Sequence, residues 1–163
     1  YHGPVDYQLI GKAVAEAHCP VLANGNVQSA TQSIEVLAQT KAAGVMVGRW
    51  AIGNPWIFCQ IRQTQLGEPL TIPTFGEVRV YIDRLWQNSV MVTERARVGY
   101  LKMFLNYVAP NIDADGQFLR QMRQAQTPQE LFEVCDRTLL QDPQHPFALS
   151  PLDRTYTNLD KLD

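Results

Sequence analysis

The sequence has 163 residues, of which 45% are hydrophobic and 18% charged, and its formal net charge is −2. This composition is typical of a globular protein, and the small net charge excludes a protein that attracts nucleic acid through its overall charge. There is no apolar run near the roughly 20 residues that a membrane-spanning helix needs.

The first predicted elements alternate between helix and strand. Apolar residues at helical spacing predict a helix over residues 5–18. Two short apolar runs, Pro20–Ala23 and Val45–Val47, are predicted to be buried strands of a parallel sheet. Between them, Ser29 and the glutamine three residues later match a capping box at the start of a helix that runs to residue 40.

Glycine-containing loops directly follow both predicted strands. Asn24, Gly25 and Asn26 follow the first strand, and Gly48 and Arg49 follow the second. A right-handed crossover would place these loops side by side at one edge of the sheet. Glycine allows close approach of the backbone to a ligand, and arginine supplies positive charge. Such loops near the last strands of a (β/α)8 barrel commonly bind phosphate, so we expect a phosphate site here.

The segment after Arg49 is predicted to lead into another helix. Asn54 is expected as its N-cap and Pro55 as its first residue, with the helix continuing to about Leu66 near the phosphate site. The aromatic residues of this segment are expected to pack in the barrel wall: Trp50, Trp56 and Phe58.

The chain is predicted to contain two different folds. Residues 1–67 read as the C-terminal βα units of a TIM barrel, an α/β fold, and residues 68–141 as an all-α helical domain. We expect residues 142–163, which contain three prolines, to be extended or disordered. A complete barrel needs about 250 residues, and the chain starts without Met, so we expect a piece of a longer protein.

Four helices are predicted in the second half. The first helix starts at the capping box of Thr74, and the second and third cover residues 94–108 and 118–124. The fourth starts at Thr127, where a capping box and a proline coincide. Their expected core residues are Val78, Tyr81, Ile82, Leu85, Trp86, Val98, Leu101, Phe104, Leu105, Val108, Leu131, Val134, Cys135 and Leu139.

Basic residues concentrate in one part of the helical half. Residues 95–123 contain five basic and two acidic residues, a net charge of +3. Two interpretations are open at this point: contact with the phosphate backbone of a nucleic acid, or an ordinary solvated helix surface. The candidate RNA-binding residues are Arg95, Arg97, Lys102, Arg120 and Arg123.

Three blocks of sequence occur in the order and at the spacing of one known family. They are the Y-x-G block of Tyr1–Tyr7, the P-V-x-A-N-G block of Pro20–Val27, and the G-V-M-V-G-R block with its P-W-I-F ending in Gly44–Phe58. Through these blocks the chain closely resembles the C-terminal portion of tRNA-dihydrouridine synthases. Lys102 and Tyr107 match the K-x-x-x-x-Y pattern of this family.

The resemblance implies an FMN-binding TIM barrel followed by a helical tRNA-binding domain. It also implies that NADPH reduces FMN, and that the reduced flavin passes a hydride to the C5=C6 bond of a uridine in tRNA. By position, Asn24, Gly25, Gly48 and Arg49 match residues that bind the FMN phosphate. Asn26 stands where Asp or Glu is common, and we expect a backbone contact there. We further expect a cytoplasmic protein without a metal or membrane segment, monomeric as the full-length enzyme.

No catalytic residue is expected in this chain, because the family's acid cysteine and its H-x-R-T histidine would precede Tyr1. Cys19, Cys59 and Cys135 match none of these positions, and we expect buried, unactivated thiols outside any disulfide or metal site. Met103 replaces a histidine found in many relatives. The isolated chain should therefore be inactive. Two alternatives stay open: a non-catalytic RNA-binding helical module, and a different FMN-dependent barrel oxidoreductase acting on a small molecule.

Overall fold

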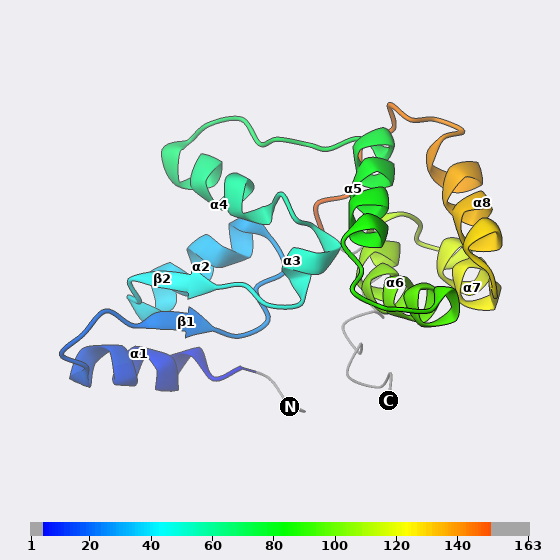
Figure 1. Cartoon of the computed structure of the whole chain (residues 1–163). Coiled ribbons are helices and arrows are strands. Elements are labelled where there is room, and N and C mark those ends of the chain that lie inside the picture. Colours follow the sequence, from blue (N-terminus) through cyan, green and yellow to red (C-terminus); the bar gives the residue numbers. More distant parts are fainter. Residues whose placement is uncertain (1–4, 151–163) are drawn as a thin grey trace. The chain divides into compact units, whose positions relative to one another are not determined.

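The computed structural model describes residues 5–150, which divide into two compact units. The first unit holds the described residues up to Thr71, and the second begins at Ile72. Both strands lie in the first unit, whereas the second is built from helices (Figure 1). The remaining residues, 1–4 and 151–163, lie outside the described part and include much of the first sequence block and most of the predicted tail.

The first unit alternates helices and strands as predicted. Helix α1 starts after Asp6, whose side chain accepts a hydrogen bond of 2.9 Å from the backbone N–H of Leu9. Helix α2 starts after Ser29, whose hydroxyl accepts a hydrogen bond of 3.2 Å from the backbone N–H of Gln32. The elements are α1 (Tyr7–Glu16), β1 (Leu22–Asn24), α2 (Ala30–Thr40), β2 (Gly44–Met46), α3 (Trp50–Gly53) and α4 (Ile57–Leu66).

The two strands are parallel, and Ala23 pairs with Val45 in the register. These two side chains face the helices and belong to the same hydrophobic cluster as the buried Val36 of α2. The prediction that both strands are fully buried is wrong for the opposite face, where Leu22 is 60% and Met46 51% exposed. Alternate strand residues point to opposite faces, and the helices of this unit cover only one of them.

The segment between β2 and α4 differs from the prediction. Asn54 does not cap α4, which begins at Ile57, but ends the short helix α3 that the sequence did not predict. The buried side chain of Asn54 donates a hydrogen bond of 2.8 Å to Gln60 Oε1, so it stabilises the turn between the two helices.

The second unit is helical, and the threonines predicted as caps occupy the starts of two of its helices. Thr74 and Glu77 form a complete capping box, and Thr127 accepts a hydrogen bond of 3.2 Å from the backbone N–H of Glu130. Consecutive helices contact one another, and α8 also contacts α5 and α6. The elements are α5 (Phe75–Gln87), α6 (Glu94–Val108), the 3-10 helix η1 (Ala109–Asn111), α7 (Gln117–Gln124) and α8 (Pro128–Leu139).

Residues 142–150 have no regular helix, but they are an ordered part of the helical unit. Phe147 is 1% exposed, and its backbone N–H donates a hydrogen bond of 2.8 Å to the carbonyl oxygen of Pro73. Asn111 holds the same segment through a hydrogen bond of 2.8 Å to the carbonyl oxygen of Ala148. The described part of the predicted tail is therefore neither separate nor disordered, because an apolar side chain anchors it in the core.

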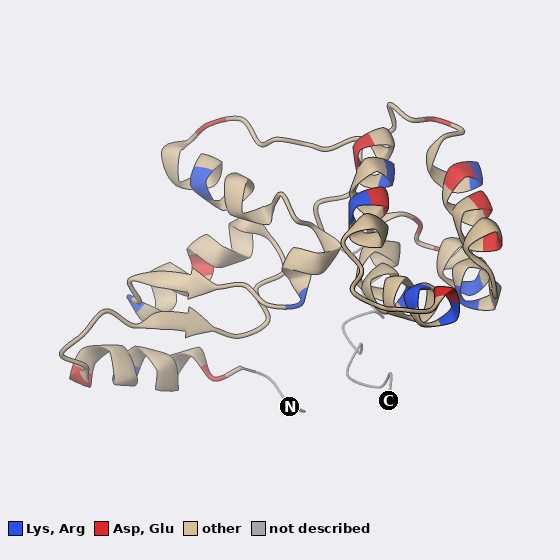
Figure 2. Ribbon diagram, in the orientation of Figure 1, with Lys and Arg blue, Asp and Glu red and all other residues tan. Residues whose placement is uncertain are grey.

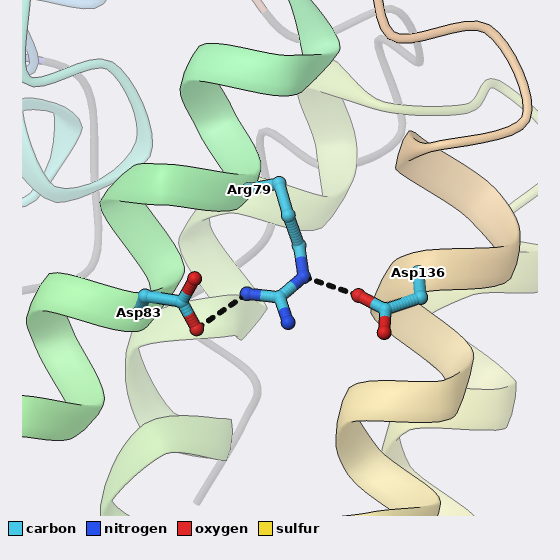
Figure 3. Close-up of polar contacts among 3 residues, drawn as sticks. All are labelled: Arg79, Asp83 and Asp136. Carbon is cyan, nitrogen blue, oxygen red and sulfur yellow. Dashed lines mark hydrogen bonds and ion pairs between the residues drawn. The ribbon is translucent and has the colours of Figure 1, made fainter.

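An arginine joins α5 to α8 (Figure 3). The guanidinium of Arg79 forms ion pairs of 2.6 Å with Asp83, one turn along α5, and of 2.5 Å with Asp136 on α8. It also lies over the ring of Phe132, 4.9 Å from the ring centre. Burial alone would lower the pKa of Arg79, but the hydrogen bonds and charges of the two carboxylates raise it, so this cation stays charged.

Candidate functional site

The parallel register brings the two predicted phosphate loops to the same edge of the sheet. Asn24, the last residue of β1, is paired with Met46, the last residue of β2. The loops that begin at Gly25 and after Met46 therefore leave the carboxyl ends of neighbouring strands (Figure 1). This is the edge at which parallel α/β sheets bind their ligands.

The first loop is held in a conformation that favours glycine. Gly25 has a φ of +157°, and a Cβ at this position would lie 2.5 Å from a methyl carbon of Val5. The Tyr7 hydroxyl donates a hydrogen bond of 2.7 Å to the carbonyl oxygen of Gly25, and burial raises the pKa of Tyr7, which keeps this donor protonated. Asn26 follows in the left-handed region, with a φ of 47°.

A side-chain hydrogen bond joins the first loop to the start of helix α3, which directly follows the second loop. The indole N–H of Trp50 donates a hydrogen bond of 3.0 Å to Oδ1 of Asn26, and Trp50 is only 8% exposed. The sequence predicted Trp50 as wall packing and Asn26 as a backbone contact. Because these residues are 24 positions apart and neither belongs to a known pairing pattern, no sequence signal identified the bond.

The second loop offers space and charge. A Cβ added to Gly48 would meet no atom within 4 Å, and both Gly48 and Arg49 are exposed. Neither residues 24–29 nor residues 47–54 contain an Asp or Glu. An open backbone position beside an arginine, without a nearby carboxylate in either loop, fits a phosphate group.

None of the three thiols belongs to either loop. Cys19 precedes β1 at the opposite end of the strand, Cys59 lies on α4, and Cys135 lies on α8 in the helical unit. The prediction that all three are buried is wrong for Cys19 and Cys59, which are exposed; for Cys135, burial raises the pKa to about 12. Residues 5–150 contain no cluster of three metal-ligating side chains and no helix long and apolar enough to cross a membrane.

Two of the five candidate RNA-binding cations are half-buried and bonded within the helical unit. Arg97 lies over the ring of Trp86, 4.0 Å from the ring centre, and donates a hydrogen bond of 2.8 Å to the carbonyl oxygen of Trp86. Lys102 donates hydrogen bonds to the carbonyl oxygens of Arg123, at 2.9 Å, and Ala125 at the end of α7.

The other three candidates are exposed. Arg123 donates two hydrogen bonds, of 3.0 and 2.9 Å, to the side chain of Asn106, and Arg120 donates one of 2.8 Å to the carbonyl oxygen of Asp115. Arg95 lies in the first turn of α6. Since a helix rises 1.5 Å per residue, Arg95 lies roughly 16 Å along α6 from Asn106. The structure thus brings Lys102 and Arg123 together but leaves Arg95 apart.

The charges of the helical unit are mixed rather than segregated. Acidic and basic residues alternate along α5, whereas α8 carries three acidic residues and one arginine (Figure 2). The five candidates lie on α6 and α7, two helices that contact each other. A cationic surface in this unit would therefore run over these two helices.

The chain matches known proteins over most of its length. A sequence model of the family described as dihydrouridine synthase (Dus) matches residues 1–144. A tRNA-dihydrouridine synthase B of Xanthomonas axonopodis pv. citri is 30% identical over 130 residues, covering 78% of this chain and 39% of that protein. A tRNA-dihydrouridine synthase B of Pseudomonas putida is 37% identical over 87 residues, covering 52% of this chain and 26% of that protein.

A third relative, a probable tRNA-dihydrouridine synthase of Rhodobacter capsulatus, is 41% identical over 68 residues, covering 42% of this chain and 21% of that protein. The chain therefore spans less than half the length of these relatives.

Proposed function

The chain belongs to the dihydrouridine synthase family, and from this premise we propose that it forms the phosphate end of the flavin site and the RNA-facing helical unit of a tRNA-dihydrouridine synthase. The pairing of the two loops carries the proposal. Two parallel strands end side by side, and the loops that follow them combine an open glycine, an exposed arginine and a bond from Trp50 to Asn26.

The residues of the first unit would hold the phosphate of FMN. Arg49 would supply the positive charge, Gly48 the open backbone position, and Asn24, Gly25 and Asn26 the facing loop. When bound and reduced by NADPH, FMN supplies the hydride that is added to the C5=C6 bond of a uridine. This chain's contribution is to anchor and orient the cofactor, and the acid that completes the reduction would come from elsewhere.

The helical unit would bind the tRNA. We propose direct contacts between RNA phosphates and the exposed Arg95, Arg120 and Arg123, while Arg97 and Lys102 support the surface from half-buried positions. Along α6, Arg95 is separated from Asn106, which the Arg123 side chain contacts; this separation favours an elongated, backbone-following contact over a single anion pocket. Such binding depends strongly on salt concentration.

The proposed activity is tested by measuring dihydrouridine in tRNA from bacteria that lack their own dihydrouridine synthases. We expect none from the isolated chain. We expect it to appear when the barrel segments of the Xanthomonas relative that precede the matched region are joined to this chain. Absence of dihydrouridine from a folded chimera that binds FMN would contradict the proposal.

A variant of the chimera tests the phosphate site within the same assay. Gly48→Ala adds a methyl group where the structure has open space, so the fold should be unaffected. We expect weaker FMN binding and less dihydrouridine, since the methyl group would occupy the position proposed for the phosphate. Unchanged activity would place the phosphate elsewhere.

A further inference from the structure

We propose that Trp50 is a positioning residue for the phosphate-binding loops, acting through its hydrogen bond to Asn26. This inference rests on the proposed function, because it assigns the two loops to one phosphate site. In this role Trp50 contacts neither the phosphate nor the reacting atoms. It fixes the loop after β1 against the loop after β2, so that both are arranged before the cofactor arrives.

The bond has only one workable arrangement. An indole nitrogen is a donor only, so it can bond the oxygen but not the nitrogen of the Asn26 side-chain amide. The amide orientation is therefore set, with its N–H2 end directed away from Trp50. Because Trp50 is 8% exposed, losing the acceptor would leave a largely buried N–H without a partner, which is unfavourable.

The loop that Trp50 holds needs support. Asn26 has a φ of 47°, in the left-handed region that asparagine adopts more often than most non-glycine residues, and Gly25 before it is also outside the usual regions. Tyr7 and Val5 hold this loop from the side of α1, through a hydrogen bond and a close contact to Gly25. Trp50 holds it from the side of the second loop. The strands are three residues each, and their pairing ends at Asn24 and Met46, so the residues beyond depend on other contacts.

The physical benefit is preorganisation. A ligand that must order two loops loses part of its binding free energy to that ordering, whereas a site held in place does not. A neutral hydrogen bond of this kind corresponds to a change of roughly threefold to tenfold in an equilibrium constant. The effect should appear in binding of a phosphorylated flavin and be absent for the same flavin without its phosphate.

The test compares the 163-residue chain with Trp50→Phe, which keeps the ring but removes the N–H, and with Asn26→Ala, which removes the acceptor. Amide hydrogen exchange at residues 25–27 is measured without flavin, and FMN and riboflavin affinities are measured by fluorescence. Trp86→Phe in the helical unit, where the ring contacts Arg97 and Phe132, is the matched control.

We expect both variants to speed exchange at residues 25–27 and to weaken FMN binding roughly threefold to tenfold, with riboflavin unchanged. The double variant should be no worse than Asn26→Ala alone, because the hydrogen bond is already lost in that variant. Asn26→Asp, which retains an acceptor oxygen, should restore slow exchange. Unchanged exchange in Trp50→Phe, additive effects in the double variant, or faster exchange with unchanged FMN affinity would overturn the proposal.

The same measurements distinguish a failure of the proposed phosphate site from a failure of the role proposed for Trp50. If the unmodified chain binds FMN no better than riboflavin, the phosphate assignment is lost and the positioning role with it, whatever the exchange data show. If the unmodified chain prefers FMN but the variants retain that preference in full, only the role of Trp50 is lost.

Discussion

The ammonium group of Lys102 lies at the carboxyl end of α7, where it donates a hydrogen bond of 2.9 Å to the carbonyl oxygen of Arg123 and another to Ala125. One turn further along α6, Asn106 accepts two hydrogen bonds from the Arg123 side chain. Helix α6 therefore holds the end of α7 at two points. Desolvation lowers the pKa of Lys102, and the nearby Glu130 opposes this effect.

This arrangement predicts a structural effect of Lys102 that is separable from RNA binding. Lys102→Met should lower the free energy of unfolding by roughly 1–2 kcal/mol, because charged hydrogen bonds to carbonyl groups at a helix end are lost. The salt dependence of tRNA binding should keep its slope. Arg95→Ala should instead reduce that slope by about one without affecting stability. The opposite pattern would make Lys102 a direct phosphate contact.

Gly25 should tolerate no side chain. Gly25→Ala would place a Cβ 2.5 Å from Val5, so we expect a loss of roughly 1–3 kcal/mol in the stability of the first unit. The double variant with Val5→Ala should recover the steric part of this loss but not the part caused by the backbone conformation. Thermal unfolding by circular dichroism measures both. Equal stability of Gly25→Ala and the unmodified chain would contradict the close contact between Gly25 and Val5.

The two ion pairs of Arg79 should contribute unequally to the free energy of unfolding. Asp136 links α5 to α8, whereas Asp83 is on the same helix as Arg79. Both carboxylates are about half exposed, so we expect Asp136→Ala to cost about 1 kcal/mol and Asp83→Ala roughly 0.3–0.5 kcal/mol. Urea unfolding of the single variants, and of each combined with Arg79→Met, measures the couplings. A larger coupling for Asp83 would be inconsistent with the contact between the two helices.

The cysteines should differ in reactivity. At pH 8 a thiol reagent should modify the exposed Cys19 and Cys59 quickly and Cys135 only after unfolding, because burial raises the pKa of Cys135 to about 12. Between pH about 9 and about 12 the unfolded chain releases this proton while the folded chain keeps it. The free energy of unfolding should therefore fall as pH rises through this window. Rapid modification of all three thiols in the folded protein would show that Cys135 is accessible.

The sequence was sufficient for features that depend on local signals. Short apolar runs followed by glycine predicted two strands ending at one edge, and the register of Asn24 with Met46 confirms this. Cap residues such as Ser29, Thr74 and Thr127 predicted helix starts, because each bonds a backbone N–H only three residues away.

The features that could not be predicted depend on contacts distant in sequence. The bond from Trp50 to Asn26 spans 24 positions and follows no spacing rule. Leu22 and Met46 are apolar, yet exposed, because exposure depends on which sheet face the helices cover. In the same way, Phe147 lies in a proline-rich segment whose composition predicts an extended or disordered tail, and its burial depends on a hydrophobic core formed by other elements.

The central claim is that the two loops bind the phosphate of a flavin, and the most direct test is the affinity of this chain for FMN compared with riboflavin. Because charged hydrogen bonds are involved, we expect FMN to bind roughly tenfold to a hundredfold more tightly. Arg49→Ala should remove most of this difference, while Arg62→Ala, an exposed arginine on α4, should leave it unchanged. Equal affinity for the two flavins, or a preference for FMN that survives loss of Arg49, would contradict the assignment.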